Sequence, residues 1–149
     1  MRKIIFLFNF LVFYLMFFLN VFALEANYFD EGKILFDKKQ FKKSKFLFEK
    51  DIVFNPKNEK SYLYLAKIYN KNESDEEEEL NLNNVLILNP KNDEAIYMLI
   101  NLKIKQYDFD QAKQLIEKFD LVCNSLCSKK NELKEKLNKL TPKNEKNNN

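Results

Sequence analysis

Apolar residues recur in this chain at the spacing of an amphipathic helix. Between Ser61 and Asn70 the apolar positions are three, one and three residues apart: Tyr62, Leu65, Ala66 and Tyr69. The segment Phe41–Phe54 carries a similar stripe, formed by Phe41, Phe48 and Ile52. Both stripes follow the 3.6-residue period of a helix. We therefore predict that both segments are helices, each with one face turned to a core.

The same pattern returns every 34 residues. Asn-Pro-Lys-Asn-Glu at 55–59 is followed by Asn-Pro-Lys-Asn-Asp at 89–93, so Pro56 and Pro90 are one period apart. Residues 41–50 and 109–118 align without a gap at twice that interval. A fixed period of this size is typical of stacked-repeat proteins. It predicts three units, at 25–58, 59–92 and 93–126.

Each unit is predicted to hold two helices. Proline biases the preceding residue away from helical angles, so Pro56 and Pro90 should follow the end of the second helix in their units. Asn58 and Asp93 are candidate N-caps of the helices that follow. Ser74 is a candidate cap for a helix that starts at Asp75, whose acidic first turn suits the helix dipole.

The repeat resembles that of the tetratricopeptide repeat (TPR) family. The residues that carry the likeness recur in pairs: Gly32 and Ala66, Leu35 and Tyr69, Phe41 and Phe109, Ser44 and Ala112, Pro56 and Pro90. The resemblance implies an all-α fold, a helical-hairpin solenoid of about three repeats. Two units depart from the pattern, at Asp75 and Glu78 and at Ile100 and Lys103. We therefore expect a shifted or loosely packed middle unit, and a third unit that is TPR-like only in its second helix.

The C-terminal part is predicted to close the solenoid. In residues 128–140 three leucines share one face among lysines and glutamates: Leu133, Leu137 and Leu140. A terminal unit needs a polar outer face, which this helix would supply as a cap. A helix that touches a membrane surface is the alternative. The helical domain is expected to span 24–140 and to be followed by a disordered tail at 141–149.

The first 23 residues resemble a secretory signal peptide. Arg2 and Lys3 precede an apolar stretch from Ile4 to Ala23, and Ala23 suits a cleavage site. An uncleaved membrane anchor is the alternative, because about 20 apolar residues can span a bilayer. The Lys-, Asn-, Ile- and Phe-rich composition suggests an AT-rich bacterial genome and hence the periplasm. Cleavage would remove two of the 25 basic residues and none of the 22 acidic ones, so near-neutrality gives no reason to expect a nucleic-acid partner.

Two cysteines are the only residues with evident chemical options. Cys123 and Cys127 form a C-x-x-x-C pair, and an even cysteine count in a secreted chain favours a disulfide. The bridge requires a backbone turn, which Asn124 and Ser125 make plausible. A redox-active pair and a copper site are the alternatives. The chain has no histidine and a single glycine, so we expect no enzymatic activity, no metal and no cofactor.

The TPR resemblance also implies a binding groove, because the first helices of successive TPR units line a concave surface. Aligned on the 34-residue period, the groove residues would be Phe29, Lys33 and Phe36, then Leu63, Lys67 and Asn70, then Tyr97, Asn101 and Ile104. The row Lys33, Lys67 and Asn101 could bind acidic groups, and the aromatic residues could anchor apolar ones. Ordinary solvated lysines and packing aromatics are the alternative interpretation.

Three functions follow from these features. The first is a non-catalytic adaptor of the bacterial periplasm that binds a protein or peptide in the groove. The second is a membrane-tethered factor that assists envelope complexes or cytochrome maturation. The third is a thiol or copper protein built on Cys123 and Cys127.

Overall fold

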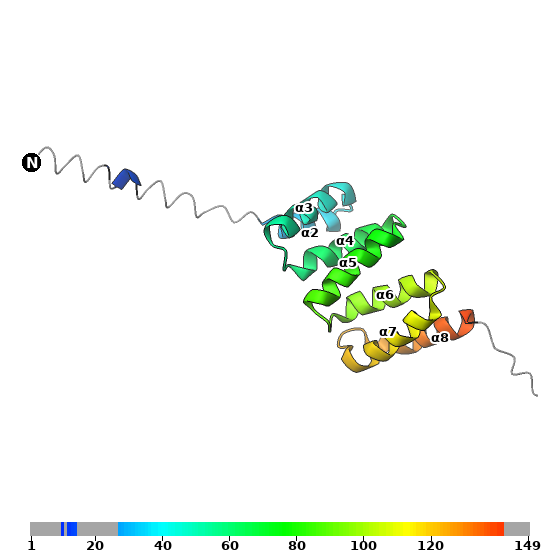
Figure 1. Ribbon diagram of the computed structural model, residues 1–149. Coiled ribbons are helices and arrows are strands. Elements are labelled where there is room, and N and C mark those ends of the chain that lie inside the picture. Colours follow the sequence, from blue (N-terminus) through cyan, green and yellow to red (C-terminus); the bar gives the residue numbers. More distant parts are fainter. Residues whose placement is uncertain (1–9, 11, 15–26, 142–149) are drawn as a thin grey trace, which may run out of the picture.

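A computed structural model of the chain describes residues 10, 12–14 and 27–141, and these contain helices but no strand. The helices are α2 (Tyr28–Asp37), α3 (Phe41–Phe54), α4 (Glu59–Lys71), α5 (Asp75–Leu88), α6 (Asp93–Lys105), α7 (Phe109–Val122), the 3₁₀ turn η1 (Cys127–Lys129) and α8 (Lys130–Leu140) (Figure 1). The predicted all-α fold is confirmed. Helix α3 has the predicted bounds, and the stripe at Ser61–Asn70 lies inside α4.

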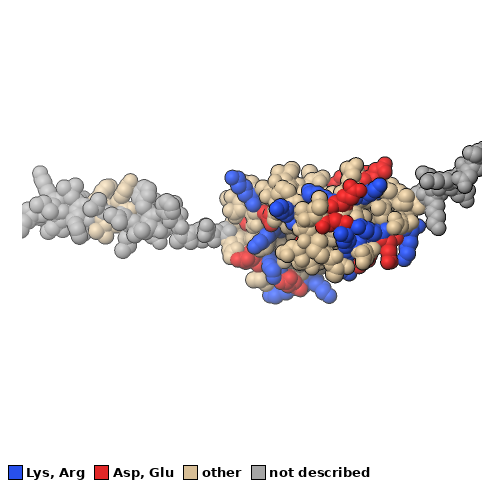
Figure 2. Space-filling view, turned by 90° about the horizontal axis from the view of Figure 1, so that it is seen from below, with Lys and Arg blue, Asp and Glu red and all other residues tan. Residues whose placement is uncertain are grey.

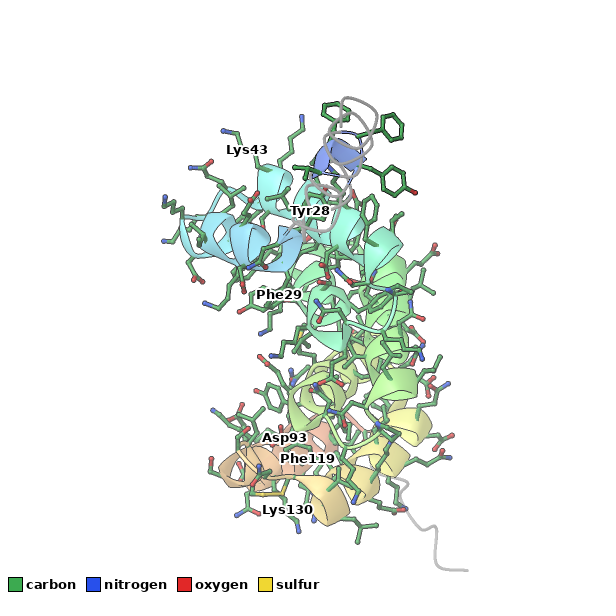
Figure 3. All side chains as sticks on the ribbon, turned by 90° about the vertical axis from the view of Figure 1, so that its left-hand side faces the viewer. Tyr28, Phe29, Lys43, Asp93, Phe119 and Lys130 are labelled. Atoms are coloured by element: carbon green, nitrogen blue, oxygen red, sulfur yellow. A yellow bond between two sulfur atoms is a disulfide. The ribbon has the colours of Figure 1, made fainter. Side chains whose placement is uncertain are left out.

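The helices form three hairpins, α2–α3, α4–α5 and α6–α7, and each helix packs against the next one along the chain. Helix α8 packs against both α6 and α7. In Figure 3 the hairpins form an arc that runs from α2 and α3 at the top to α7 and α8 at the bottom. Helices α2, α4, α6 and α8 lie on its inner side, the concave face, and α3, α5 and α7 lie on its outer side, the convex face.

The 34-residue period is visible in the backbone. Lys39, Glu73 and Tyr107, one period apart, each have a positive φ, of 58°, 57° and 61°. Each residue lies in the turn between the two helices of its hairpin. The left-handed region is uncommon for residues other than glycine, so three occurrences at one interval show that the same tight turn closes all three hairpins.

The Asn-Pro-Lys-Asn segments join successive hairpins. At the first of them Asp51, at the end of α3, accepts hydrogen bonds from the side-chain amides of Asn55 (3.0 Å) and Asn58 (2.7 Å). At the second, Asn89 donates to Glu59 at the start of the same unit (3.0 Å). Helices α3 and α5 end directly before these segments, as the two prolines predicted. The asparagines are therefore fixed by polar contacts as well as by the turn.

The middle unit is neither shifted nor loose, contrary to expectation. Glu78 takes the position of Ser44 and Ala112 and is only 1% exposed. Its two carboxylate oxygens accept from Nδ2 of Asn70, both at 3.0 Å. The buried charge is thus hydrogen-bonded by the facing helix, which lets α5 pack closely on α4 despite the departure from the repeat pattern.

The third unit is a complete hairpin, so the expectation that only its second helix would resemble the others is wrong. Ile100 is fully buried, and Lys103 is 6% exposed. The Lys103 amine donates to Glu79 of the preceding unit (2.6 Å), which accounts for a lysine in this buried place. Asn92, and not Asp93, is the N-cap of α6, because its side chain accepts from the backbone N–H of Ala95.

Helix α8 closes the array as predicted, and it does so as the first helix of a fourth unit. Leu65, Leu99 and Leu133 are 34 residues apart and 2%, 4% and 0% exposed. Leu133 therefore repeats the contact that the other two leucines make in α4 and α6. Leu137 is half-buried, whereas Leu140 is 47% exposed and lies at the edge of the predicted apolar face.

The apolar core follows the array from end to end. One cluster around Phe48 joins the first hairpin to α4, a second around Leu63 and Leu82 joins α4, α5 and α6, and a third around Ile100 and Leu133 joins α6, α7 and α8. All three lie within residues 27–141. The sharing of each cluster between hairpins is what lets short helices stay folded.

The predicted signal peptide at 1–23 falls almost entirely outside the described residues, and so does the tail from 142 onward. Within residues 10, 12–14 and 27–141, no helix combines the length and the apolar character needed to cross a membrane.

Candidate functional site: the concave face

The nine predicted groove residues belong to α2, α4 and α6, the three helices that build most of the concave face. They fall into three rows one period apart, and the structure gives each row a different environment. In sequence order the rows are Phe29, Leu63 and Tyr97, then Lys33, Lys67 and Asn101, then Phe36, Asn70 and Ile104.

The first row lies at the edge of the groove and is largely packed. Leu63 is 8% exposed and belongs to the core. Phe29 is half-buried, with its ring 5.8 Å from that of Phe48 and 5.7 Å from that of Tyr64 (Figure 3). Tyr97 is half-buried, and its hydroxyl donates to Glu132 of α8 (3.4 Å). Phe29 and Tyr97 keep partial access to the concave face, and Leu63 does not.

The second row is on the surface, but its cations are paired. The Lys33 amine lies 3.0 Å from Asp37, and the hydrogen bond to this carboxylate raises the pKa of Lys33. The Lys67 amine lies 2.9 Å from Glu94 of the next unit and 4.8 Å from the centre of the Tyr64 ring. An acidic ligand must therefore compete with Asp37 and Glu94 for these lysines.

Asn101, the third member of that row, makes two contacts of its own. Its Nδ2 donates to the backbone carbonyl of Tyr97 (2.9 Å), and its Oδ1 accepts from the Lys136 amine of α8 (2.7 Å). Lys136 thus extends the row to α8, a contribution that the sequence did not suggest.

The third row contacts the second helix of its own hairpin, and its assignment to the groove is wrong for Ile104. Ile104 is 1% exposed and lies in the core between α6 and α7. Asn70 donates to the buried Glu78 of α5. Phe36 is half-buried, with its ring 5.3 Å from Phe41 and 4.9 Å from Tyr64.

Tyr64 is the groove residue that sequence reasoning missed. Its ring contacts those of Phe29, Phe36 and Phe48, so it joins α4 to the first hairpin. Met98 takes the equivalent position of α6 and packs against the Leu63 cluster. Both residues come directly after a predicted groove position, and a shift of one residue in the assumed helix face would have found them.

These contacts join residues of the concave face into one candidate site, the concave site. It consists of Phe29, Lys33, Tyr64, Lys67 and Glu94, drawn from α2, α4 and α6. Aromatic rings form its floor, and two lysines and a carboxylate stand at its rim. Such a surface suits a segment with apolar side chains and charges of both signs.

A second hollow lies on the convex face, between α5 and α7. It has a volume of about 800 Å³, and its floor is formed by Leu86, Leu99 and Leu115. Lys103 borders it, in the position that Tyr69 occupies one unit earlier. Tyr69 packs there beneath the Lys45 amine, 4.7 Å from its ring centre. The Lys103 side chain fills less space than the Tyr69 ring does one unit earlier. This difference helps to leave the interface between α5 and α7 open.

The two cysteines flank a loop that leaves α7. Their Cα atoms are 5.3 Å apart, within the range for a disulfide, and the backbone turns out of the helix at Cys123 as the pairing requires. Figure 3 shows the paired sulfur atoms beside Asp93 and Lys130. Among the residues that the structure describes, no group of three or more potential metal ligands surrounds them.

Asp93 holds this loop against the start of α6. Its Oδ2 accepts from the backbone N–H groups of Asn124, Ser125 and Leu126, at 2.9, 2.7 and 3.0 Å. Burial on its own would raise the pKa of the Asp93 carboxyl, but these hydrogen bonds outweigh it and lower the pKa. The carboxylate therefore stays ionised and fixes the cysteine loop in place.

No protein-family model and no curated protein matches the chain. Solved structures do match its fold. The TPR2B domain of yeast Sti1, in a complex with pHsp70, aligns with a TM-score of 0.67 and 19% identity over 74% of this chain and 93% of that one. The first TPR of Spaghetti (RPAP3), bound to the HSP90 peptide SRMEEVD, aligns with a TM-score of 0.67 and 17% identity over 76% of this chain and 92% of that one. The Arabidopsis OM64 TPR domain aligns with a TM-score of 0.64 and 15% identity over 76% of this chain and 90% of that one.

Those similarities are structural. At 15–19% identity they establish that the chain has the fold of a TPR domain, a helical-hairpin solenoid of the kind that the repeat pattern predicted.

Proposed function

We propose that the chain is a non-catalytic interaction module that binds a peptide or an extended protein segment on its concave face. The observation that carries this proposal is the concave site itself, an aromatic floor built by the first two hairpins with Glu94 of the third hairpin at its rim. Two structures of the same fold contain a bound peptide: the first TPR of Spaghetti (RPAP3) with an HSP90 peptide, and the second TPR domain of human RPAP3 with an HSP70 peptide. They support peptide binding as the use of this architecture.

The kind of ligand follows from the charges. The peptides in those two structures, SRMEEVD and SGPTIEEVD, end in acidic residues. In this chain Lys33 and Lys67 already face Asp37 and Glu94. Within the Lys67–Glu94 pair the carboxylate is the more exposed partner, at 44% against 23% for the lysine side chain. We therefore propose a ligand that offers an apolar or aromatic side chain to Tyr64 and a basic group to Glu94, in preference to an acidic C-terminus.

The test is selection from a random peptide library displayed on phage, with the chain lacking residues 1–23 as bait. All three core clusters lie within 27–141, so this chain keeps its complete core. Backbone amide shifts in an NMR titration then locate the selected peptide. We expect shifts in α2, α4 and α6, and at least tenfold weaker binding for Glu94→Lys, which reverses a partly exposed rim charge.

A matched control is Ile87→Asn on the convex face, where the side chain is 76% exposed. This variant should bind the selected peptides as the parent chain does. Peptides whose shifts fall on α5 and α7 instead would place binding in the convex hollow and contradict the proposed site.

For the setting, we propose export across a bacterial inner membrane with removal of residues 1–23. The alternative, a retained N-terminal segment, would make the chain a membrane-tethered factor for envelope complexes or cytochrome maturation. Both rest on the apolar stretch between Ile4 and Ala23. N-terminal sequencing of the native protein separates them, because cleavage gives a first residue of Leu24.

We propose that Cys123 and Cys127 form a structural disulfide in that oxidising setting. The turn at Cys123 and the Cα separation of 5.3 Å support the pairing. The alternative is a thiol or copper protein. Alkylation followed by mass spectrometry distinguishes them: a bridge that blocks alkylation, and a reduced chain that takes up no copper, would support the structural role.

A further inference from the structure

The outward surface of α3 combines exposed apolar side chains with lysines. We call it the α3 outer face, and it consists of Lys42, Lys43, Phe46, Lys50, Val53 and Phe54. Phe46, Val53 and Phe54 are 63%, 74% and 64% exposed. The spacing of three and four residues places all six on one side of the helix. Three large apolar side chains and three lysines thus share one side of the helix.

The cations of this face are not neutralised. Within the described part of the chain, Lys42 and Lys43 have no ion-pair partner, and Figure 3 shows Lys43 at the outer end of the arc. Lys50 lies over the ring of Tyr28, 4.3 Å from its centre. The exposed carboxylate of α3, Glu49, pairs with Lys45 (3.6 Å). The face therefore carries a net positive charge.

This combination belongs to the first unit alone. One period later, α5 keeps the apolar positions as Leu80 and Ile87, 61% and 76% exposed, but Glu76 and Glu77 replace the two lysines. Unit 25–58 has eight lysines and six acidic residues, whereas unit 59–92 has four and seven. Both signs are visible on the surface (Figure 2). Of these two units, only the first therefore offers an anionic partner a favourable potential.

The chain itself indicates which anionic partner this is. The apolar stretch that ends at Ala23 precedes α2 by only four residues, and α2 packs on α3. Four residues reach about 14 Å at most. A chain that retains this stretch in a bilayer would hold the first hairpin at the lipid headgroups, and a cleaved chain would be released beside them.

We infer that the α3 outer face binds the surface of an anionic membrane. Phe46, Val53 and Phe54 enter the boundary between headgroups and acyl chains, and the lysines contact headgroup phosphates. Long lysine side chains suit this arrangement because their stems cover apolar surface while the amines stay in the polar layer. The concave site is on other helices, so it faces away from the lipid and remains open to a peptide.

Vesicle co-sedimentation tests the inference. The chain lacking residues 1–23 is mixed with vesicles of phosphatidylcholine alone or with added phosphatidylglycerol. We expect binding only to the anionic vesicles, and less of it at high salt. Lys42→Glu with Lys43→Glu, which copies the charge of α5, should weaken binding by about tenfold or more. Phe46→Ser with Val53→Ser should weaken it at low and at high salt.

The matched control is Leu80→Ser with Ile87→Ser, the same two positions one unit later. It should bind vesicles as the parent chain does, and circular dichroism should show equal helix content in all variants, because every substituted side chain is exposed. The inference is overturned if the parent chain does not bind vesicles, binds neutral ones equally well, or is weakened as much by the control. A dimer that Phe46→Ser with Val53→Ser dissociates, without vesicle binding, would assign this face to a second copy instead.

Discussion

The side chain of Phe48 fills the space beside Gly32, and this is why the first unit has a glycine there. A Cβ atom on residue 32 would lie 2.8 Å from Cε1 of Phe48. Phe48 is fully buried, and its ring is held by Phe29 (5.8 Å) and Tyr64 (5.0 Å), so it has little room to yield. The small residue that the repeat pattern identified is thus explained by one aromatic contact.

Gly32→Ala should therefore lower the free energy of unfolding, by about 1–3 kcal/mol for overpacking against a helix-propensity gain of about 1 kcal/mol. Urea denaturation measures the difference. Phe48→Leu in the same background should recover part of it by removing the ring atoms that clash. An unchanged midpoint for Gly32→Ala alone would show that the ring can move.

Glu78 is a carboxyl group whose burial raises its pKa above the ordinary 4.5, and the hydrogen bond from Asn70 offsets this only in part. The folded state then binds a proton more tightly than the unfolded state, so the group's contribution to stability falls as pH rises through the window above 4.5. We expect Glu78→Gln to lose this component of the pH dependence.

The measurement is the unfolding free energy of the parent chain and of Glu78→Gln at several pH values from acid to neutral. The parent chain should lose stability relative to the variant as pH rises. Exposed Glu76→Gln, two residues away, is the control and should follow the parent chain. A difference that grows in the opposite direction would mean that Asn70 stabilises the ionised form more than burial penalises it.

At the level of the helices, the hydrophobic period predicted most of what is observed. Helix α3 was located to the residue, and the two prolines marked the ends of α3 and α5. Which flank of an apolar stripe faces a neighbouring helix was not predictable. Ile104 comes three residues after Asn101, the position equivalent to Lys67, and side chains three residues apart on a helix differ in direction by about 60°. This difference is enough to turn Ile104 into the core while Lys67 stays on the surface.

The repeat pattern also did not predict contacts between residues that are far apart in the sequence. Glu78 looked like a defect in the repeat because its partner Asn70 lies on the other helix of the hairpin. Asp93 looked like a helix cap, but its carboxylate binds backbone amides about thirty residues away along the chain. Each of these polar contacts depends on how two separate segments pack together. The spacing of apolar residues along one helix carries no information about that packing.

Helix α8 offers a test of the cap within one element. Leu133→Ala should lower the free energy of unfolding by about 2–4 kcal/mol, because it removes a fully buried side chain from the last core cluster. Leu140→Ala, at a position 47% exposed, should change it far less. Thermal or urea denaturation compares the two. Equal effects would indicate that α8 does not pack on α6 and α7 in solution.

For the whole molecule, stability should decrease from the middle of the array to its ends. Helices α4 and α6 contribute five and seven buried residues, whereas α2 and α8 contribute one each. In a stacked array each unit depends on its neighbours, and the end helices have a neighbour on one side only.

Native-state hydrogen exchange should therefore show the slowest amides in α4 and α6 and the fastest helical amides in α2 and α8. Measurement at several low urea concentrations separates local opening from global unfolding. Equal protection in all helices would mean that the array opens as a single unit.

The likeness of α8 to α4 and α6 has a consequence for how such a chain can lengthen. Leu133 places this helix in the register of an inner helix, and within residues 27–141 no outer helix follows it. Duplicating one hairpin before it would move the same closing helix outward by one step. A chain of this kind could therefore gain or lose one 34-residue hairpin while α8 keeps the same packing on the hairpin before it.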